Sequence, residues 1–181
     1  PFVTDATVKE VKAENSMGEY ISVKENTIEL TFPLSPDDII YGLGEQMGGI
    51  NKRGRKYRSF FFFYPCHTED KEALYGAHNF FVLSGKENFG IFIDFPGEIH
   101  WDMGFYKEDE ISVVITGTDA DIYEISGNSE MEIIKEFREL IGKSYLPPMW
   151  AFGYQQSRWS YPNKEQIDRI VKGYEDADIP L

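Results

Sequence analysis

The sequence AHNFFVLSGKENFGIFIDF, residues 77–95, decides the fold class of this chain. Two runs rich in aromatic and branched apolar residues, 77–84 and 89–95, flank the polar stretch Gly85-Lys86-Glu87-Asn88. Such runs are typical of β-strands, and a short polar stretch that contains glycine is typical of the turn between two paired strands. Residues 77–95 therefore predict an antiparallel hairpin of two largely buried strands.

More strands are predicted on both sides of this hairpin. Polar and apolar residues alternate over residues 27–32, which is the pattern of a strand with one buried face. Shorter apolar runs at 99–103, 111–116 and 121–125 continue the series. Strands of this number and spacing predict a mainly β chain folded as an antiparallel β-sandwich up to about residue 128.

The period of the apolar residues changes after this point. Ser129 is followed three residues later by Glu132, which is the pattern of a capping box, and apolar residues then recur at helical spacing. We expect a helix over about 129–142 that Gly142 ends. Pro147-Pro148 cannot continue a helix and predicts a linker.

A strand and a second helix are expected after the linker. Residues 149–155 predict a strand, and Asn163 with Gln166 three residues later predicts the start of a helix. This helix has one apolar stripe, formed by Ile167, Ile170, Val171 and Tyr174. Either it lies on its own sandwich or it is the first crossover helix of a βα barrel. The order strand, loop, helix favours the barrel.

Charge and composition exclude several classes of function. The 181 residues carry a net charge of −13, so phosphate backbones and anionic lipids are repelled and a neutral ligand is favoured over nucleic acid or a membrane. Apolar runs are too short to cross a bilayer. The single cysteine, Cys66, rules out an internal disulfide framework and suits a cytoplasmic location.

Four motifs together resemble the N-terminal region of glycoside hydrolase family 31, the α-glucosidases and α-xylosidases. They are YGLGE at residues 41–45, GINKRG at 49–54, YGAHNF at 75–80 and PPMWAFGYQQSRW at 147–159. The resemblance runs from about Asp38 to the end of the chain and is weaker upstream. YGLGE is only superficially like a phosphate-binding loop, because no lysine and no helix start follow it at the spacing that such a loop requires.

The resemblance implies both a fold and an activity. It implies a galactose mutarotase-like β-sandwich, here residues 1–143, followed by the start of a catalytic (β/α)8 barrel, here 144–181. The family hydrolyses α-glycosides with retention through two aspartates and no cofactor. Both aspartates lie on later barrel strands, so we expect the chain to be a piece of a larger α-glucosidase and to be inactive alone.

Three residues are candidates for substrate binding. The resemblance places Trp159 at the border of the substrate pocket, where an exposed indole can stack on the apolar face of a sugar; the alternative is a core tryptophan at the barrel mouth. The resemblance also implies that the loop 59–66, which contains Phe63 and Tyr64, reaches over the pocket. These aromatics form either an apolar lip at the leaving-group site or a surface buried against the barrel or a partner subunit.

Other polar residues are weaker candidates. His67, His78 and His100 lack the spacing of metal ligands, so no metal is expected. Asp94 and Asp102 suit solvated strand ends better than a catalytic pair. Two other functions stay open: a stand-alone carbohydrate-binding or interaction sandwich, and an α-xylosidase or transglycosylase of the same family. A homo-oligomer also stays open.

Overall fold

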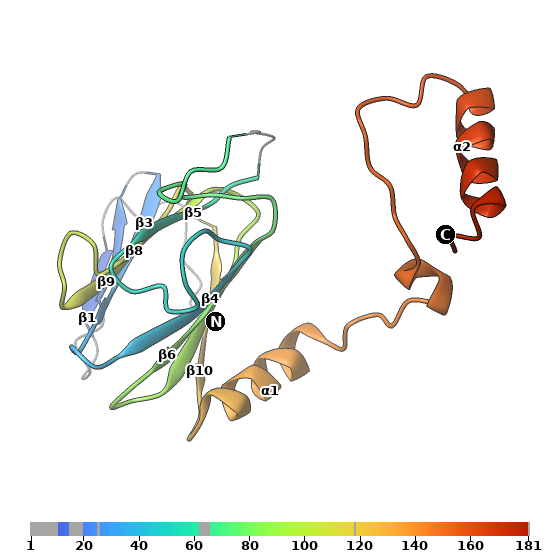
Figure 1. Ribbon diagram of the computed structural model, residues 1–181. Helices are drawn as coiled ribbons and strands as arrows, with labels where there is room; N and C mark the ends of the chain where they lie inside the picture. Colours follow the sequence, from blue (N-terminus) through green and yellow to red (C-terminus); the bar gives the residue numbers. More distant parts are fainter. Residues whose placement is uncertain (1–10, 15–19, 25, 62–65, 118, 181) are drawn as a thin grey trace. The chain divides into compact units, whose positions relative to one another are not determined.

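The computed structural model describes all residues except 1–10, 15–19, 25, 62–65, 118 and 181 (Figure 1). The chain divides into two compact units, which are Pro1–Ile141, the first unit, and Gly142–Leu181, the second unit. The sequence predicted two domains, residues 1–143 and 144–181, and this division into domains stays a prediction. No helix in the described ranges is long and apolar enough to cross a membrane.

The described part of the first unit contains two antiparallel sheets. The larger sheet has the order β1 (Val11–Glu14), β2 (Tyr20–Lys24), β3 (Thr27–Pro33), β9 (Glu110–Ile115), β8 (Ile99–Met103) and β5 (Lys56–Ser59). The smaller sheet has the order β10 (Asp121–Ser126), β7 (Phe89–Asp94), β6 (Ala77–Ser84) and β4 (Ile39–Gly44). The predicted mainly β fold is therefore confirmed.

The hairpin that decided the fold class forms as predicted. Strands β6 and β7 pair antiparallel, with Leu83 opposite Phe89. The amide of Gly85 donates to the side-chain oxygen of Asn88 at 3.2 Å and closes the turn. The other predicted strands, at 27–32, 99–103, 111–116 and 121–125, are β3, β8, β9 and β10.

The core lies between the two sheets. Alternation along β3 turns Ile28, Leu30 and Phe32 inward, and all three are buried. Phe32 contacts the rings of Phe81 and Phe89 from the smaller sheet, at centroid distances of 6.0 Å and 5.9 Å. Each such side chain contributes about 1.5–3 kcal/mol when it is fully buried. This packing holds the strand ends that form the site described below.

A bulge bends β4 in the YGLGE motif. Gly42, Leu43 and Gly44 all have positive φ, at 121°, 64° and 76°, and the pairing with β6 shifts between the two glycines. A Cβ on Gly42 would lie 2.4 Å from the carbonyl oxygen of Phe80, so only glycine fits there. The glycines thus serve a bend in the sandwich.

Helix α1 (Glu130–Ile141) packs on the smaller sheet, against β6, β7 and β10 (Figure 1). The hydroxyl oxygen of Ser129 accepts the amide of Glu132 at 3.3 Å, which is half of the predicted capping box. The Glu132 carboxylate accepts the amide of Asn128 instead of that of Ser129. The ring of Phe137 stacks on Phe80 at 3.9 Å and attaches the helix to the sheet.

The second unit contains a short 3-10 helix, η1 (Met149–Phe152), and helix α2 (Lys164–Asp176). The predicted start of α2 is confirmed, because the side-chain oxygen of Asn163 accepts the amide of Gln166 at 2.9 Å. The strand predicted over 149–155 is wrong. A parallel barrel strand takes its backbone hydrogen bonds from neighbours on both sides, and the described residues of this unit contain no strand to pair with it.

Candidate functional site

A cleft of about 340 Å³ opens at one end of the sandwich in the first unit. It lies where β5 ends, where β6 begins and where the chain turns from β7 into β8, so both sheets contribute to it. Its volume is within the range of small-molecule pockets, roughly 300–1,000 Å³. The residues that line it are Ser59, Phe60, Phe61, Ala77, Asn79, Phe95, Pro96, Gly97 and Glu98.

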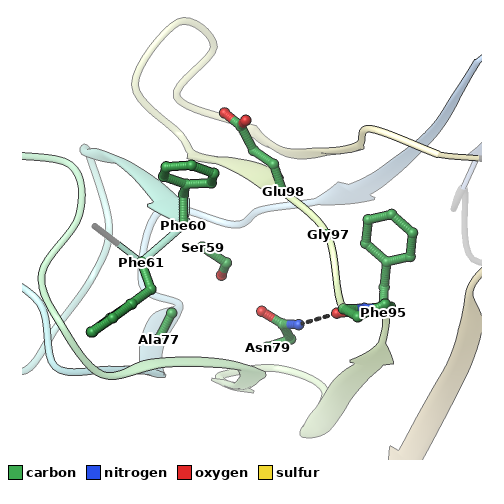
Figure 2. A pocket seen from close by; sticks show the side chains of 9 residues that line it. Ser59, Phe60, Phe61, Ala77, Asn79, Phe95, Gly97 and Glu98 are labelled. Carbon is green, nitrogen blue, oxygen red and sulfur yellow. Dashed lines mark hydrogen bonds between the residues drawn. The ribbon is translucent and has the colours of Figure 1, made fainter. Parts of the chain in front are cut away.

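Aromatic rings form the walls of the cleft. Figure 2 shows Phe60 and Phe61 on one side and Phe95 on the other, with Asn79 between them. The side chain of Phe61 is 67% exposed although its ring meets Tyr75 edge to face at 6.1 Å. Exposed rings that other rings hold in place offer a ligand a flat apolar surface.

Polar groups lie between these walls. The side-chain amide of Asn79 donates to the carbonyl of Phe95 at 3.1 Å, which fixes the Asn79 side chain and turns it across the cleft (Figure 2). The hydroxyl oxygen of Ser59 accepts the indole N–H of the buried Trp101 at 2.8 Å. Because a hydroxyl can donate as well as accept, Ser59 keeps its own hydrogen for a ligand.

Glu98 brings a negative charge to the rim of the cleft. It forms an ion pair with Arg58, and its Oε1 lies 2.9 Å from Nε2 of His100. The guanidinium of Arg58 lowers the pKa of Glu98 below its usual range, and the charge of His100 acts in the same direction. Glu98 is therefore ionised at neutral pH and accepts hydrogen bonds, in contrast to a catalytic acid, which needs a raised pKa.

The acidic residues Asp94 and Asp102 do not line the cleft. The sequence predicted that Asp102 is a solvated charge at a strand end, and the structure differs. The two carboxylate oxygens of Asp102 accept the amides of Phe105 and Tyr106, at 2.7 Å and 3.3 Å, and so close a turn. Asp94 is exposed at the end of β7, opposite Asp121. Outside the masked positions, no cluster of three or more histidine, cysteine or acidic residues could hold a metal.

The predicted substrate-binding residues lie in different places. Phe63 and Tyr64 lie outside the described residues, whereas Phe60, in the same aromatic run, lines the cleft. Trp159 belongs to the second unit, where its indole is 93% exposed. The adjacent Arg158 places its guanidinium over the ring of Tyr161 at 5.3 Å.

Some residues of the cleft could not be found in the sequence. Asn79 stands inside a strand of apolar residues, and nothing in that pattern shows that it turns into a cleft. Phe95 ends an apolar run that is typical of a core strand, and it lines the cleft because the chain turns after it. The ring nitrogens of His67, which lies outside the cleft lining, are 3.1 Å from Nζ of Lys71 and 3.4 Å from the hydroxyl of Tyr75.

Two family models match the chain. Residues 3–102 match the glycosyl hydrolase 31 N-terminal galactose mutarotase-like domain, and residues 144–181 match the glycosyl hydrolases family 31 TIM-barrel domain. Together the two matches reproduce the order of a sandwich followed by a barrel.

Curated relatives carry the names of glycosidases. Alpha-glucosidase 2 of Bacillus thermoamyloliquefaciens is 32% identical over 147 residues, which are 80% of this chain and 18% of that protein. The alpha-glucosidase of Saccharolobus solfataricus is 26% identical over 94% of this chain and 25% of its own length. Alpha-xylosidase 1 of Arabidopsis thaliana is 29% identical over 87% of this chain and 18% of its own length. The chain thus spans a quarter or less of the length of these relatives.

Solved structures show the same fold. A GH31 dextranase of Flavobacterium johnsoniae, complexed with isomaltotriose, matches with a TM-score of 0.74 and 26% identity, over 93% of this chain and 22% of that one. A cycloalternan-degrading enzyme of Trueperella pyogenes, complexed with isomaltose, matches with a TM-score of 0.72 over 95% and 28%. Its identity is 14%, so this likeness concerns the fold alone.

Proposed function

The chain belongs to glycosyl hydrolase family 31, and from this we propose that it forms the N-terminal part of a retaining α-glucosidase that removes terminal α-linked glucose from oligosaccharides. The observation that carries the proposal is the order of the two matches. The sandwich match ends at residue 102 and the barrel match begins at residue 144 of one chain. Relatives that are similar over 80% or more of this chain include two alpha-glucosidases.

The proposed chemistry needs a pair of carboxyl groups at the glycosidic bond. In a retaining glycosidase they stand about 5–5.5 Å apart; one attacks the anomeric carbon and the other serves as acid and then as base. Asp94, Glu98 and Asp102 do not form such a pair, because Glu98 and Asp102 are engaged elsewhere. We place the two aspartates on later barrel strands, outside these 181 residues.

The first unit would then contribute to sugar binding. A sugar ring has an apolar C–H face that can stack on Phe60 or Phe61, and hydroxyls that can pair with Asn79 and Glu98. That Phe63, Tyr64 and Trp159 each contact the sugar in the whole protein is also part of the proposal. A neutral substrate agrees with the net charge of −13. A second use of the same rings, burial against the barrel or a partner subunit, would remove them from the sugar.

An α-xylosidase is the second candidate, because relatives from Arabidopsis thaliana and Emericella nidulans are alpha-xylosidases. A xyloside lacks the hydroxymethyl group of a glucoside, so the two activities differ in the fit of one small group, which is worth about 1–3 kcal/mol. A cytoplasmic location is also part of the proposal, and its support is the single cysteine, Cys66.

Three measurements test the proposal. The mass of the native polypeptide in its source cells, detected with an antibody to this region, should greatly exceed 20.9 kDa. That polypeptide should hydrolyse p-nitrophenyl α-glucoside with a higher kcat/KM than the α-xyloside, and NMR should show α-glucose as the first product. The 181-residue chain alone should show no turnover. A native mass near 20.9 kDa would favour a stand-alone carbohydrate-binding sandwich.

A further inference from the structure

A second aromatic surface lies at the other end of β5 and β8. It consists of Phe105 and Tyr106, which follow β8 and are here called the aromatic platform. Their rings meet edge to face at 5.1 Å and are 52% and 74% exposed. Strands β5 and β8 pair with Lys56 opposite Asp102 at this end and Ser59 opposite Ile99 at the cleft end. Since a strand rises about 3.4 Å per residue, the two surfaces lie roughly 10 Å apart along β5.

The platform is held rigidly before any ligand arrives. Both oxygens of Asp102 accept backbone amides, one from Phe105 and one from Tyr106. Gly104 turns the chain with a φ of 83°, and a Cβ there would lie 2.8 Å from a methyl carbon of Leu34. A ligand that binds to a turn fixed in this way does not have to order it, so little binding free energy is lost.

Charged groups surround the two rings. The Nζ atom of Lys56 lies 5.3 Å from the ring centre of Phe105 and 5.4 Å from that of Tyr106. The same nitrogen pairs with Glu72 at 2.8 Å, and the hydrogen bond to Glu72 raises the pKa of Lys56 above its ordinary value. A cationic donor and an anionic acceptor therefore stand beside the exposed rings.

We propose that the aromatic platform is a second sugar-binding site, separate from the cleft, for a neutral α-linked glucan chain. One ring face stacks on the C–H face of a glucose unit, while Lys56 donates to its hydroxyls and Glu72 accepts from them. The sugar class rests on the proposed function. Charges next to the rings argue against a protein interface, whose centre is depleted of charged residues.

The acidic character of the chain selects among carbohydrates. Glu72 pairs with Lys56 beside the rings, and Glu110 pairs with Lys107, which directly follows the two aromatics. With the net charge of −13, these carboxylates repel sulfated or uronic acid chains. A longer glucan that touches platform and cleft together would bind more tightly than either contact alone, because its second contact is intramolecular.

The test is an NMR titration of the ¹⁵N-labelled 181-residue chain with maltoheptaose and isomaltoheptaose. The amides of Phe105 and Tyr106 report on the platform, and those of Asn79 and Glu98 report on the cleft. We expect saturable shifts at Phe105 and Tyr106. Shifts at the cleft without shifts at the platform would overturn this inference and leave the proposed function standing. No shift at either surface would overturn the platform and also count against sugar binding by the cleft.

Paired variants separate the two surfaces. Phe105→Ala with Tyr106→Ala should abolish the platform shifts and leave the cleft shifts unchanged; Phe61→Ala should leave the platform shifts unchanged. Tyr106→Ala alone, at the more exposed ring, is the milder variant and should lower platform affinity at least tenfold. If Tyr106→Ala leaves sugar affinity unchanged but changes the mass in sedimentation equilibrium, the platform is a protein interface and the inference is wrong.

Discussion

The guanidinium carbon of Arg58 lies 4.5 Å from the ring centre of Phe60. The same guanidinium forms an ion pair with Glu98, so one side chain contacts both an aromatic wall of the cleft and the carboxylate at its rim. A cation over a ring face restricts both partners. Arg58 is therefore a positioning residue for the cleft, and its removal should change Glu98 and Phe60 together.

Arg58→Met tests this relationship, because methionine keeps an apolar stem and removes the charge. The pKa of Glu98 should rise toward its ordinary value, since its largest stabilising partner is gone. A ¹³C titration of the Glu98 carboxyl measures the change. Lys86→Met, in the exposed turn between β6 and β7, is the matched control and should leave Glu98 unchanged. If the Glu98 titration is the same in Arg58→Met and wild type, the ion pair does not exist in solution.

The lowered pKa of Glu98 also predicts a pH dependence of stability. The folded pKa lies below the ordinary value of 4.5, so the ionised carboxylate stabilises the folded state at any pH above that value. This contribution is lost as the pH falls through the lowered folded pKa. Urea unfolding of Glu98→Gln and wild type should thus differ most above the ordinary pKa of 4.5 and converge as the pH falls below the lowered folded pKa.

The comparison with Glu98→Gln is needed because other carboxylates titrate in the same range. Asp70 and Glu130 also have lowered pKa values, from hydrogen bonds to Thr68 and Ser84. They affect wild type and variant alike and cancel in the difference. A difference in the free energy of unfolding that stays constant from pH 7 to pH 3 would show that Glu98 makes no ionic contribution.

Gly42→Ala tests the bulge in β4. The added Cβ would lie 2.4 Å from the carbonyl oxygen of Phe80, and φ at this position is 121°. Backbone strain of this kind costs on the order of 1–3 kcal/mol, and the clash adds to it. We expect Gly42→Ala to lower the free energy of unfolding of the first unit by at least about 2 kcal/mol.

Gly49→Ala is the control for the bulge. A Cβ at Gly49 would meet nothing within 4 Å, so its effect on stability should be within about 0.5 kcal/mol. Equal stability of the two variants in urea would mean that β4 adopts another conformation than the one described.

The sequence predicted the parts of the fold that depend on local pattern. The alternation at residues 27–32 and the glycine-containing turn after Ser84 each depend on neighbours in the chain, and both formed as predicted. The strand predicted over 149–155 did not form, because its hydrogen bonds depend on other strands of a barrel. Local signals thus predicted the sandwich, whereas a barrel strand needs partners from elsewhere in the protein.

Fewer features of the cleft than of the fold could be predicted from the sequence. The aromatic run 60–64 was visible in the sequence, and two of its residues line the cleft. Asn79 reaches the cleft only because β6 begins beside the end of β5, and Glu98 only because the chain turns between β7 and β8. Pairing between distant segments decides these positions, and a single sequence contains no signal for it.

Trp159 provides the sharpest test of the proposed sugar site in the whole protein. Its indole is 93% exposed in the second unit, so it makes few contacts there that Trp159→Ala could remove. If it stacks on the sugar, Trp159→Ala should raise KM and lower kcat/KM by roughly tenfold or more, while Tm changes by less than about 2 °C. Trp159→Phe keeps a flat ring and should recover part of the loss. If instead Trp159→Ala lowers Tm by more than about 5 °C and leaves KM unchanged, Trp159 is a core residue of the barrel mouth and the sugar contact is wrong.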